Sequence, residues 1–306
     1  MDLQKEEVGF CGLGSMGSEM AGNVLAALQA SCDKTLFVWN RDQDKTKPLV
    51  EKGATALPSV EEVAARCSVV MVMLANDAAL RSVFEAYINA PSRPKGASFV
   101  DCSTVAPKLT TELAEKAKAK GVTYLSCQVF GRPDAAKAKQ LIVVAAGDPA
   151  AKAKCMPLLE AMGKQVMDFG DNPANGTVTK LIGNFFISSL IEMFSEGMTL
   201  AKANGVSQQD IADLAGQLMP GPIPTGYAQR IAKGNFEITP QSPGFAMTGG
   251  AKDVGHAINL AKDSGMTLQI AEITKGHMDE LCRNEDEAKL DWGAVKLAVE
   301  RAAGQK

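Results

Sequence analysis

The feature that most constrains the fold of this chain is a run of three glycines, Gly12, Gly14 and Gly17, in the pattern GxGxxG. An apolar segment, Val8–Cys11, comes directly before the run, and an amphipathic helical pattern over residues 18–28 follows it. In such a unit the first glycine permits a tight turn, the second lets a pyrophosphate approach the backbone, and the third lets the helix pack on the strand. Free N–H groups at the helix N-terminus then bind the phosphates. The predicted cofactor contacts are Gly12, Leu13, Gly14, Ser15, Met16 and Gly17.

Residues 8–170 alternate short apolar runs with longer amphipathic ones, which is typical of strand–helix–strand units around a parallel sheet. The apolar runs have the composition of strands buried on both faces. We predict strands at residues 8–11, 35–39, 68–74, 98–100, 122–125, 141–145 and 165–169. Helical patterns, including those at residues 59–65 and 106–120, lie between them.

The pattern after residue 172 is helical only. Apolar residues recur at three- and four-residue steps from Asn172 to Asn204, which predicts one long helix. Further helices are expected at residues 207–218, 251–264, 268–282 and 291–302, with a proline-rich loop at residues 219–224. We therefore predict an α/β fold class, with an N-terminal Rossmann-type domain over residues 1–170 that binds the cofactor. An all-α substrate and dimerisation domain, residues 171–306, follows it through the long helix.

Composition excludes several classes of protein. Thirty-two Lys and Arg face 35 Asp and Glu, a net charge of −3, so no surface is built to neutralise nucleic acid. Uncharged stretches are too short, or too interrupted by proline, to cross a bilayer. Two histidines and seven scattered cysteines without CxxC spacing predict no metal site and reduced thiols. The charged N-terminus runs straight into a strand without an export signal, so we expect a cytoplasmic protein without nucleic-acid or membrane partners.

The choice between the two nicotinamide cofactors depends on the residues that follow the second predicted strand. An Asp or Glu at this place would accept a hydrogen bond from an adenosine 2′-hydroxyl. The chain has Asn40 and Arg41 instead, and Lys45 adds positive charge nearby. Because a guanidinium binds phosphate well, this arrangement favours NADP(H). Asp42 and Asp44 lie close by and count against this assignment.

Five short motifs follow one another along the chain. They are GFCGLGSMG at residues 9–17, DCST at 101–104, Lys180 with Asn184, Gly244-Phe245 with Lys252-Asp253, and DWGAV at 291–295. In these motifs the whole chain resembles the β-hydroxyacid dehydrogenase family. That family includes the 3-hydroxyisobutyrate dehydrogenases, the glyoxylate and succinic semialdehyde reductases and, more distantly, 6-phosphogluconate dehydrogenase.

The resemblance implies that Lys180 is the general acid or base for the substrate oxygen and that Asn184 helps to hold the substrate. Their spacing of four residues places both on one helical face. As hydride reaches a carbonyl carbon the oxygen becomes negative, and an ammonium stabilises this charge and then donates its proton. An ordinary lysine is protonated at neutral pH and therefore suits reduction, whereas alcohol oxidation requires the neutral amine.

Two loops follow the carboxyl ends of predicted strands, where open α/β sheets bind ligands. The resemblance implies that they touch the nicotinamide ribose, with Thr104 near the ring, that Phe245 covers the nicotinamide and that Lys252 approaches cofactor or substrate. His256, one turn after Lys252, either faces the same cleft or has a structural role. The loop residues are Leu74, Ala75, Asn76, Ser103 and Thr104.

The chain departs from the family pattern at two places that concern the substrate. Where the family has Ser-Gly-Gly after a valine, this chain has Phe130, Gly131 and Arg132. Arg132 is a candidate for binding a carboxylate, while Phe130 would narrow the pocket or favour an apolar substrate. The other departure is Gly183, which stands where many members have an asparagine before the one that matches Asn184.

Three functions remain open from the sequence. The first is an NADPH-dependent reductase of a small aldehyde or keto acid, or the reverse oxidation of a β-hydroxy acid. The second is an imine reductase of the same architecture, a group that usually lacks the lysine. The third is a non-catalytic dimerisation module, whose relatives lose the lysine and carry a chromatin-binding extension. The hydrophobic surface of the long helix predicts a homodimer or homotetramer.

Overall fold

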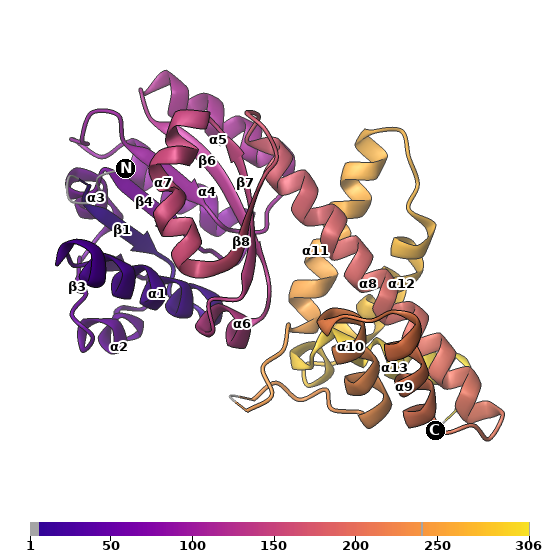
Figure 1. Cartoon of the computed structure of the whole chain (residues 1–306). Helices are drawn as coiled ribbons and strands as arrows, with labels where there is room; N and C mark the ends of the chain where they lie inside the picture. The colour runs from indigo at the N-terminus through magenta and orange to yellow at the C-terminus, as the bar shows by residue number, and fades with distance from the viewer. Residues whose placement is uncertain (1–5, 240, 306) are drawn as a thin grey trace. The chain divides into compact units, whose positions relative to one another are not determined.

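The computed structural model describes residues 6–239 and 241–305 (Figure 1), so residues 1–5 of the charged N-terminal stretch and residues 240 and 306 lie outside the description. The chain divides into two compact units, Met1–Lys180 and Leu181–Lys306. The first unit is an α/β structure and the second is helical, as the periodicities predict.

The first unit is built on one eight-stranded sheet with the order β3-β2-β1-β4-β5-β6-β7-β8. Strand β1 lies between β2 and β4, so the strand order reverses beside the glycine run. Open sheets bind dinucleotides at such a reversal point. The strands are β1 (Val8–Cys11), β2 (Phe37–Trp39), β3 (Thr55–Ala56), β4 (Val69–Val72), β5 (Ser98–Asp101), β6 (Thr123–Phe130), β7 (Leu141–Gly147) and β8 (Gly163–Asp168).

The sheet is not wholly parallel, which corrects the prediction. Strand β7 pairs with β6 in the antiparallel sense, and β8 is parallel to β7. Only residues 131–140 join β6 to β7, and helix α6 (Pro133–Lys137) takes up half of them. A parallel crossover needs a dozen residues or more, so this connection can only reverse the chain.

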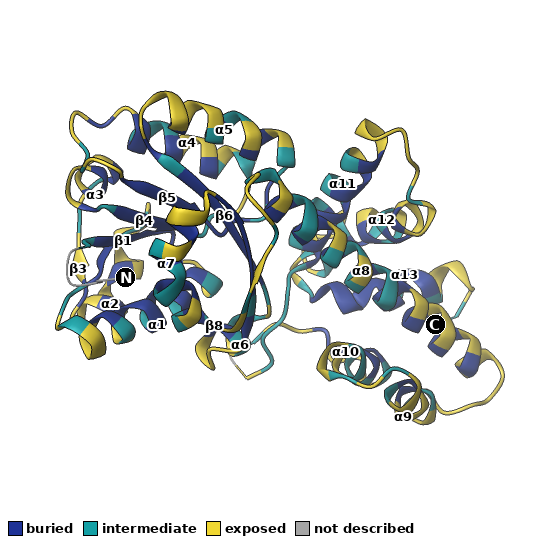
Figure 2. Cartoon of the chain, turned by 45° about the horizontal axis from the view of Figure 1, so that its top comes forward, coloured by how far each residue is buried: buried dark blue, intermediate teal, exposed yellow. Residues whose placement is uncertain are grey.

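Helices cover both faces of the sheet (Figure 2), and strands β1, β4 and β5 are buried along their whole length, whereas the edge strands β3 and β8 are largely exposed. One core cluster includes residues of α1 and α7, and the other includes residues of α3, α4 and α5. The helices are α1 (Ser15–Cys32), α2 (Lys47–Val50), α3 (Val60–Arg66), α4 (Asp77–Ile88), α5 (Pro107–Ala119), α6 and α7 (Pro149–Met162), with a 3-10 turn η2 (Gln43–Thr46).

The long helix α8 (Ala174–Ala203) begins in the first unit and ends in the second, within two residues of the predicted bounds. The other elements of the second unit are α9 (Gln208–Leu218), α10 (Pro222–Lys233), α11 (Met247–Asp263), α12 (Gln269–Cys282), η3 (Glu287–Lys289), η4 (Trp292–Ala294) and α13 (Val295–Ala302). The prediction of a loop over residues 219–224 is wrong in its second half, because α10 starts at Pro222. Proline suits the first position of a helix, where no N–H partner is needed.

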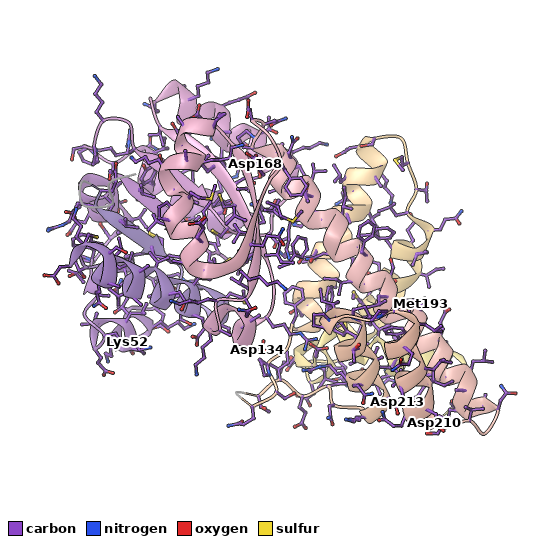
Figure 3. The ribbon with its side chains drawn as sticks, viewed as in Figure 1. Lys52, Asp134, Asp168, Met193, Asp210 and Asp213 are labelled. Atoms are coloured by element: carbon purple, nitrogen blue, oxygen red, sulfur yellow. The ribbon has the colours of Figure 1, made fainter. Side chains whose placement is uncertain are left out.

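An exposed apolar stripe follows one side of α8. Its members are Ile182, Phe186, Met193 and Leu200, separated by steps of four, seven and seven residues, and their exposed fractions are 44%, 63%, 47% and 67%. Such steps keep the side chains on one helical face. Met193, near the middle of the stripe, is labelled in Figure 3. None of the helices in the described ranges is long and apolar enough to cross a membrane.

Candidate active site

The glycine run forms the turn between β1 and α1, and its glycines meet different surroundings. Gly12 has a φ of +96°, and a Cβ there would lie 2.3 Å from the carbonyl oxygen of Met73. A Cβ at Gly17 would lie 1.9 Å from the carbonyl oxygen of Gly12. Around Gly14, by contrast, a Cβ would meet nothing within 4 Å. Packing therefore explains Gly12 and Gly17, while Gly14 leaves open space at the start of α1.

The open space at Gly14 fits a phosphate group. Gly14 is the N-cap residue of α1 and provides no side-chain hydrogen bond to the first turn. The first N–H groups of a helix have no partner within the helix, and together with the helix dipole they attract anions. The turn thus offers both the space and the donors that a pyrophosphate requires.

Asn40, at the end of β2, makes two hydrogen bonds within the first unit. Its Oδ1 accepts a hydrogen bond from the backbone N–H of Leu13 at 2.8 Å, and its Nδ2 donates to the carbonyl of Asp42 at 2.8 Å. The carboxamide therefore ties the end of β2 to the glycine turn. This contact joins residues that are 27 positions apart, so a periodicity argument could not find it.

The cationic side chains beside Asn40 are open to solvent. Arg41 and Lys45 are exposed, and no hydrogen bond or ion pair of their side chains is found within residues 6–239 and 241–305. The neighbouring acids are engaged: Asp42 accepts from the N–H of Asp44 at 3.2 Å, and Asp44 pairs with Lys47 at 2.7 Å. The guanidinium is thus available to a phosphate, and the two carboxylates have other contacts.

A buried carboxyl group organises the loops that follow β4 and β5. Asp101 is fully buried and accepts hydrogen bonds from the N–H of Ser103 and the hydroxyl of Tyr124, both at 2.9 Å. The Ser103 hydroxyl in turn accepts from the N–H of Leu74 at 2.9 Å. Burial raises the pKa of Asp101 to about 6, although the hydrogen bonds from Ser103 and Tyr124 oppose the shift. This network fixes two of the predicted cofactor-loop residues relative to each other.

The remaining loop residues are more accessible. Ala75 and Asn76 are exposed, and the Oδ1 of Asn76 accepts from the N–H of Ala79 at 2.9 Å as the N-cap of α4. Thr104 is half-buried and directly follows Ser103. These residues lie after the carboxyl ends of β4 and β5, as the sequence predicts.

Lys180 lies in the second turn of α8 and is only 8% exposed. Its ammonium nitrogen lies 4.1 Å from the ring centroid of Phe130, the last residue of β6. Gly131 follows with a φ of +139°, and Arg132 is the half-buried N-cap residue of α6. The structure thus brings together the predicted acid and the residue that departs from the family pattern.

In the second unit a buried carboxylate joins two of the predicted site residues. Asn184 donates from Nδ2 to Oδ2 of Asp253 at 2.6 Å, and the ammonium of Lys252 lies 3.1 Å from Oδ1 of the same group. Asp253 is 1% exposed. In the sequence, the only signal for Asp253 is its place directly after Lys252. His256 is half-buried one turn further along α11.

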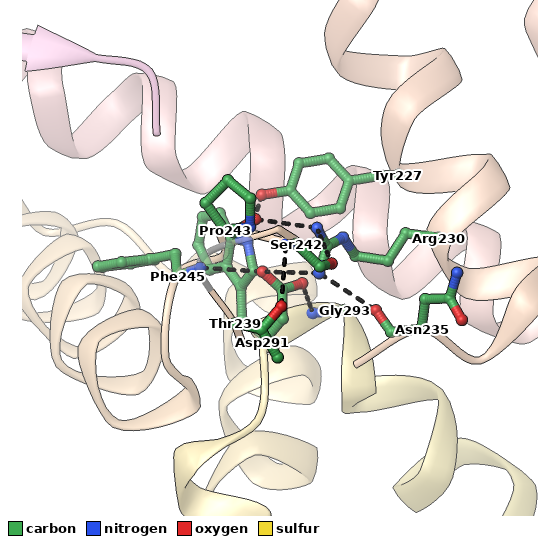
Figure 4. Close-up of polar contacts among 10 residues, drawn as sticks. Tyr227, Arg230, Asn235, Thr239, Ser242, Pro243, Phe245, Asp291 and Gly293 are labelled. Carbon is green, nitrogen blue, oxygen red and sulfur yellow. Dashed lines mark hydrogen bonds and ion pairs between the residues drawn. The ribbon is translucent and has the colours of Figure 1, made fainter. Parts of the chain in front are cut away.

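Phe245 lies in a loop that two buried groups hold in place (Figure 4). Its backbone N–H donates to Oδ2 of Asp291 at 2.9 Å, and its ring meets Trp292 edge-on with the centroids 5.1 Å apart. Arg230 donates from Nη2 to the carbonyl of Pro243 at 3.0 Å. Because Asp291 is fully buried, these contacts fix the backbone just before α11.

Two family models match consecutive parts of the chain. Residues 7–170 match the NAD binding domain of 6-phosphogluconate dehydrogenase. Residues 174–297 match the model described as NAD-binding of NADP-dependent 3-hydroxyisobutyrate dehydrogenase. Among curated proteins, glyoxylate/succinic semialdehyde reductase 1 of Arabidopsis thaliana is 31% identical over 297 residues, which cover 96% of this chain and 98% of that protein.

Solved structures share the fold. The 3-hydroxyisobutyrate dehydrogenase of Mycobacterium tuberculosis with L-serine superposes with a TM-score of 0.82 at 24% identity, over 96% of this chain and 99% of that chain. A reductive aminase from Aspergillus terreus with NADPH, cyclohexanone and allyl amine has a TM-score of 0.60 at 21% identity, over 95% and 98% of the two chains. From the matched models and relatives, the chain belongs to the 3-hydroxyisobutyrate dehydrogenase family of NAD(P)-binding oxidoreductases.

Proposed function

We propose that this oxidoreductase uses NADPH to reduce a small aldehyde or keto acid, or catalyses the reverse oxidation of a β-hydroxy acid, with Lys180 as the general acid. The observation that carries the proposal is the burial of Lys180 in the second turn of α8, in a chain of this family. A lysine at 8% exposure is rare unless its charge has a structural or chemical role. We assign cofactor binding to residues 1–170 and the substrate and dimer contacts to residues 171–306, with Lys180 and Asn184 at the start of the latter.

The cofactor would be held at the carboxyl edge of the sheet. The glycine turn and the first turn of α1 suit the pyrophosphate, and Arg41 with Lys45 suits a 2′-phosphate. Asn40 acts by holding Leu13. Bound NADPH supplies a hydride to the carbonyl carbon. The remaining proposed contacts are Leu74, Ala75, Asn76, Thr104, Phe245 and Lys252, with Ser103 beside the substrate.

Lys180 completes the reduction by moving one proton. As the new C–H bond forms, the π electrons of the carbonyl move to its oxygen. The Lys180 ammonium stabilises that charge, its N–H bond breaks, and an O–H bond forms to give the alcohol. Solvent then returns a proton to the amine. We assign substrate binding to Asn184, whose carboxamide is oriented by Asp253, and to Phe130, Gly131 and Arg132.

A substrate panel tests the proposal. The purified protein is mixed with NADPH or NADH and with semialdehydes, keto acids and cyclic imines, and in reverse with NADP+ or NAD+ and β-hydroxy acids, while cofactor absorbance is followed. We expect carbonyl reduction that is faster with NADPH than with NADH. Absence of turnover with every carbonyl and β-hydroxy acid would contradict the proposal.

Imine reduction is the second candidate, supported by the fold shared with the reductive aminase and by the aromatic Phe130. An iminium carbon already carries positive charge and needs no proton donor at its nitrogen during hydride transfer. The presence of Lys180 therefore favours the carbonyl substrate. Cyclic imines turned over faster than every carbonyl in the same panel would reverse this order.

The exposed apolar stripe of α8 supports assembly into a homodimer or homotetramer. An exposed, contiguous apolar surface of this kind marks a protein–protein interaction site. A cytoplasmic location is in keeping with the seven cysteines, all of which are free thiols. Sedimentation of the purified protein as a monomer at micromolar concentration would contradict the assembly.

A further inference from the structure

One face of strand β6 packs against the first two turns of α8. Ser126, Gln128 and Phe130 alternate along the strand and therefore point to the same side of the sheet. A Cβ on Gly176 would lie 2.5 Å from Oγ of Ser126 and 2.7 Å from Oε1 of Gln128, so this part of the helix touches the strand. One helical turn later, Lys180 lies on Phe130.

The match between strand and helix is geometric. Two residues along a strand advance by about 6.6 Å, and four residues along a helix advance by about 6 Å. The step from Gln128 to Phe130 along the strand therefore covers about the same distance as the step from Gly176 to Lys180 along the helix. Since Gly176 can approach so closely only without a side chain, it sets the register that places the ammonium on the ring.

The backbone beyond the ring has little freedom. Gly131 has a φ of +139°, and a Cβ there would lie 2.5 Å from Cδ2 of Leu141 and 3.2 Å from Cβ of Ala135. Phe130 itself is paired with Ile142 across the antiparallel β6–β7 ladder. The ring is thus held from the strand side, and the attraction between an ammonium and an aromatic face holds Lys180 on it.

We propose, on the basis of the function proposed above, that Phe130 is a specificity-determining residue that narrows this substrate range, favouring uncharged aldehydes with an apolar or aromatic substituent over substrates that carry a carboxylate. Phe130 offers no hydrogen-bond donor to an anion. Its ring face carries partial negative charge, which attracts the Lys180 ammonium and repels a carboxylate. A substrate whose carbonyl oxygen reaches Lys180 therefore meets an apolar surface where a serine would have offered a hydroxyl.

Matched substrates and variants test this inference. Succinic semialdehyde and its methyl ester differ in the negative charge and in one methyl group, and the purified protein is assayed with each in the presence of NADPH. We expect kcat/KM to be about tenfold higher for the ester, as one charge-assisted hydrogen bond accounts for such a factor. Phe130→Ser should lower this ratio about tenfold through the KM of the semialdehyde, and Phe130→Leu, which offers no hydrogen-bond donor either, should preserve it.

A measurement without cofactor or substrate tests the contact itself. In protein labelled at lysine, the ε-methylene protons of Lys180 should be shifted upfield by the ring, and Lys180→Arg identifies the signal by its absence. Phe130→Leu should move that signal to an ordinary position, while circular dichroism and the melting temperature show that the variant is folded. An ordinary shift in the parent would overturn the contact.

The outcomes separate this inference from the proposed function. A parent that reduces the semialdehyde as well as the ester, or a Phe130→Ser variant with an unchanged ratio, overturns the role of Phe130 and leaves the carbonyl reductase standing. Absence of reduction with any carbonyl overturns the proposed function itself.

Discussion

Two strand-to-helix turns of the first unit carry glycines for opposite reasons. In the turn after β1, Gly14 has nothing within 4 Å of where its Cβ would be. In the turn after β6, Gly131 is crowded by Leu141 and has a φ of +139°. Gly14 leaves room for a ligand, whereas Gly131 is required by the backbone conformation and packing of the chain itself.

This contrast separates the general part of the site from the specific part. The cofactor turn uses backbone N–H groups and open space, which are the same for any side chains around it. The β6 turn holds a rigid backbone so that the side chain before it, Phe130, has a fixed direction toward Lys180. We infer that cofactor binding and substrate choice can be changed independently.

The sharpest test of the contrast replaces each glycine by alanine. Gly131→Ala should lower the free energy of unfolding by about 4 kcal/mol, from backbone strain and overpacking against Leu141 together. Gly14→Ala should change it by less than about 0.5 kcal/mol. Chemical denaturation measures both values. Equal destabilisation by the two substitutions would remove the distinction.

A second test addresses Asp101, beneath the loops after β4 and β5. Burial raises its pKa from 3.8 to about 6, so folding favours the protonated form. Its contribution to stability is full below pH 3.8 and is lost as pH rises through about 6, a loss of about 3 kcal/mol. The stability of the parent relative to Asp101→Asn should therefore fall over this range. Parallel pH curves for the two proteins would contradict the assignment.

The third test concerns Arg41 and affects only the cofactor. Arg41→Ala should weaken NADPH binding about tenfold, the value of one charge-assisted phosphate contact, and leave NADH binding unchanged. Lys45→Ala is the matched control with a smaller effect, because an ammonium lacks the bidentate donor geometry with which a guanidinium binds phosphate. Fluorescence titration gives the four dissociation constants. If Arg41→Ala weakens both cofactors equally, the 2′-phosphate assignment is wrong.

The smallest expected effect belongs to Gly14→Ala in the same titration. The new methyl group occupies space that a pyrophosphate would use, so NADPH and NADH should both bind several-fold more weakly. Weaker cofactor binding by Gly14→Ala, with an unchanged free energy of unfolding, would sharpen the contrast with Gly131. Unchanged affinity for both cofactors would show that the space at Gly14 is not used.

Much of the fold follows from local patterns. The seven predicted strands are confirmed, because apolar runs mark them; their ends shift by at most two residues, except that the strand predicted at residues 122–125 extends to Phe130. The two-residue strand Thr55–Ala56 was missed, since so short an exposed segment has no pattern. Apolar runs do not show the antiparallel direction of β7, which follows from the short connection between β6 and β7. They also do not show the start of α10 at Pro222, which follows from the tolerance of the first helical position for proline.

The sequence indicates which residues belong to the candidate site, but it does not indicate which of them touch one another. Lys180 and Phe130 are 50 positions apart, and Asn184 and Asp253 are 69 apart, so only the packed structure brings each pair together. Asn40 illustrates the same limit, because its carboxamide accepts a hydrogen bond from Leu13, which lies 27 positions away. Such long-range pairings depend on tertiary packing, which a single sequence does not display.

The central claim is that the Lys180 ammonium donates the proton during carbonyl reduction. Lys180→Met keeps the length of the side chain and its apolar contact with Phe130 but removes the charge. In single-turnover reduction with bound NADPH, Lys180→Met should react about a thousandfold more slowly than the parent, with the affinity for NADPH unchanged. A variant that reduces the same carbonyl within twofold of the parent rate, at about the same affinity, would contradict it.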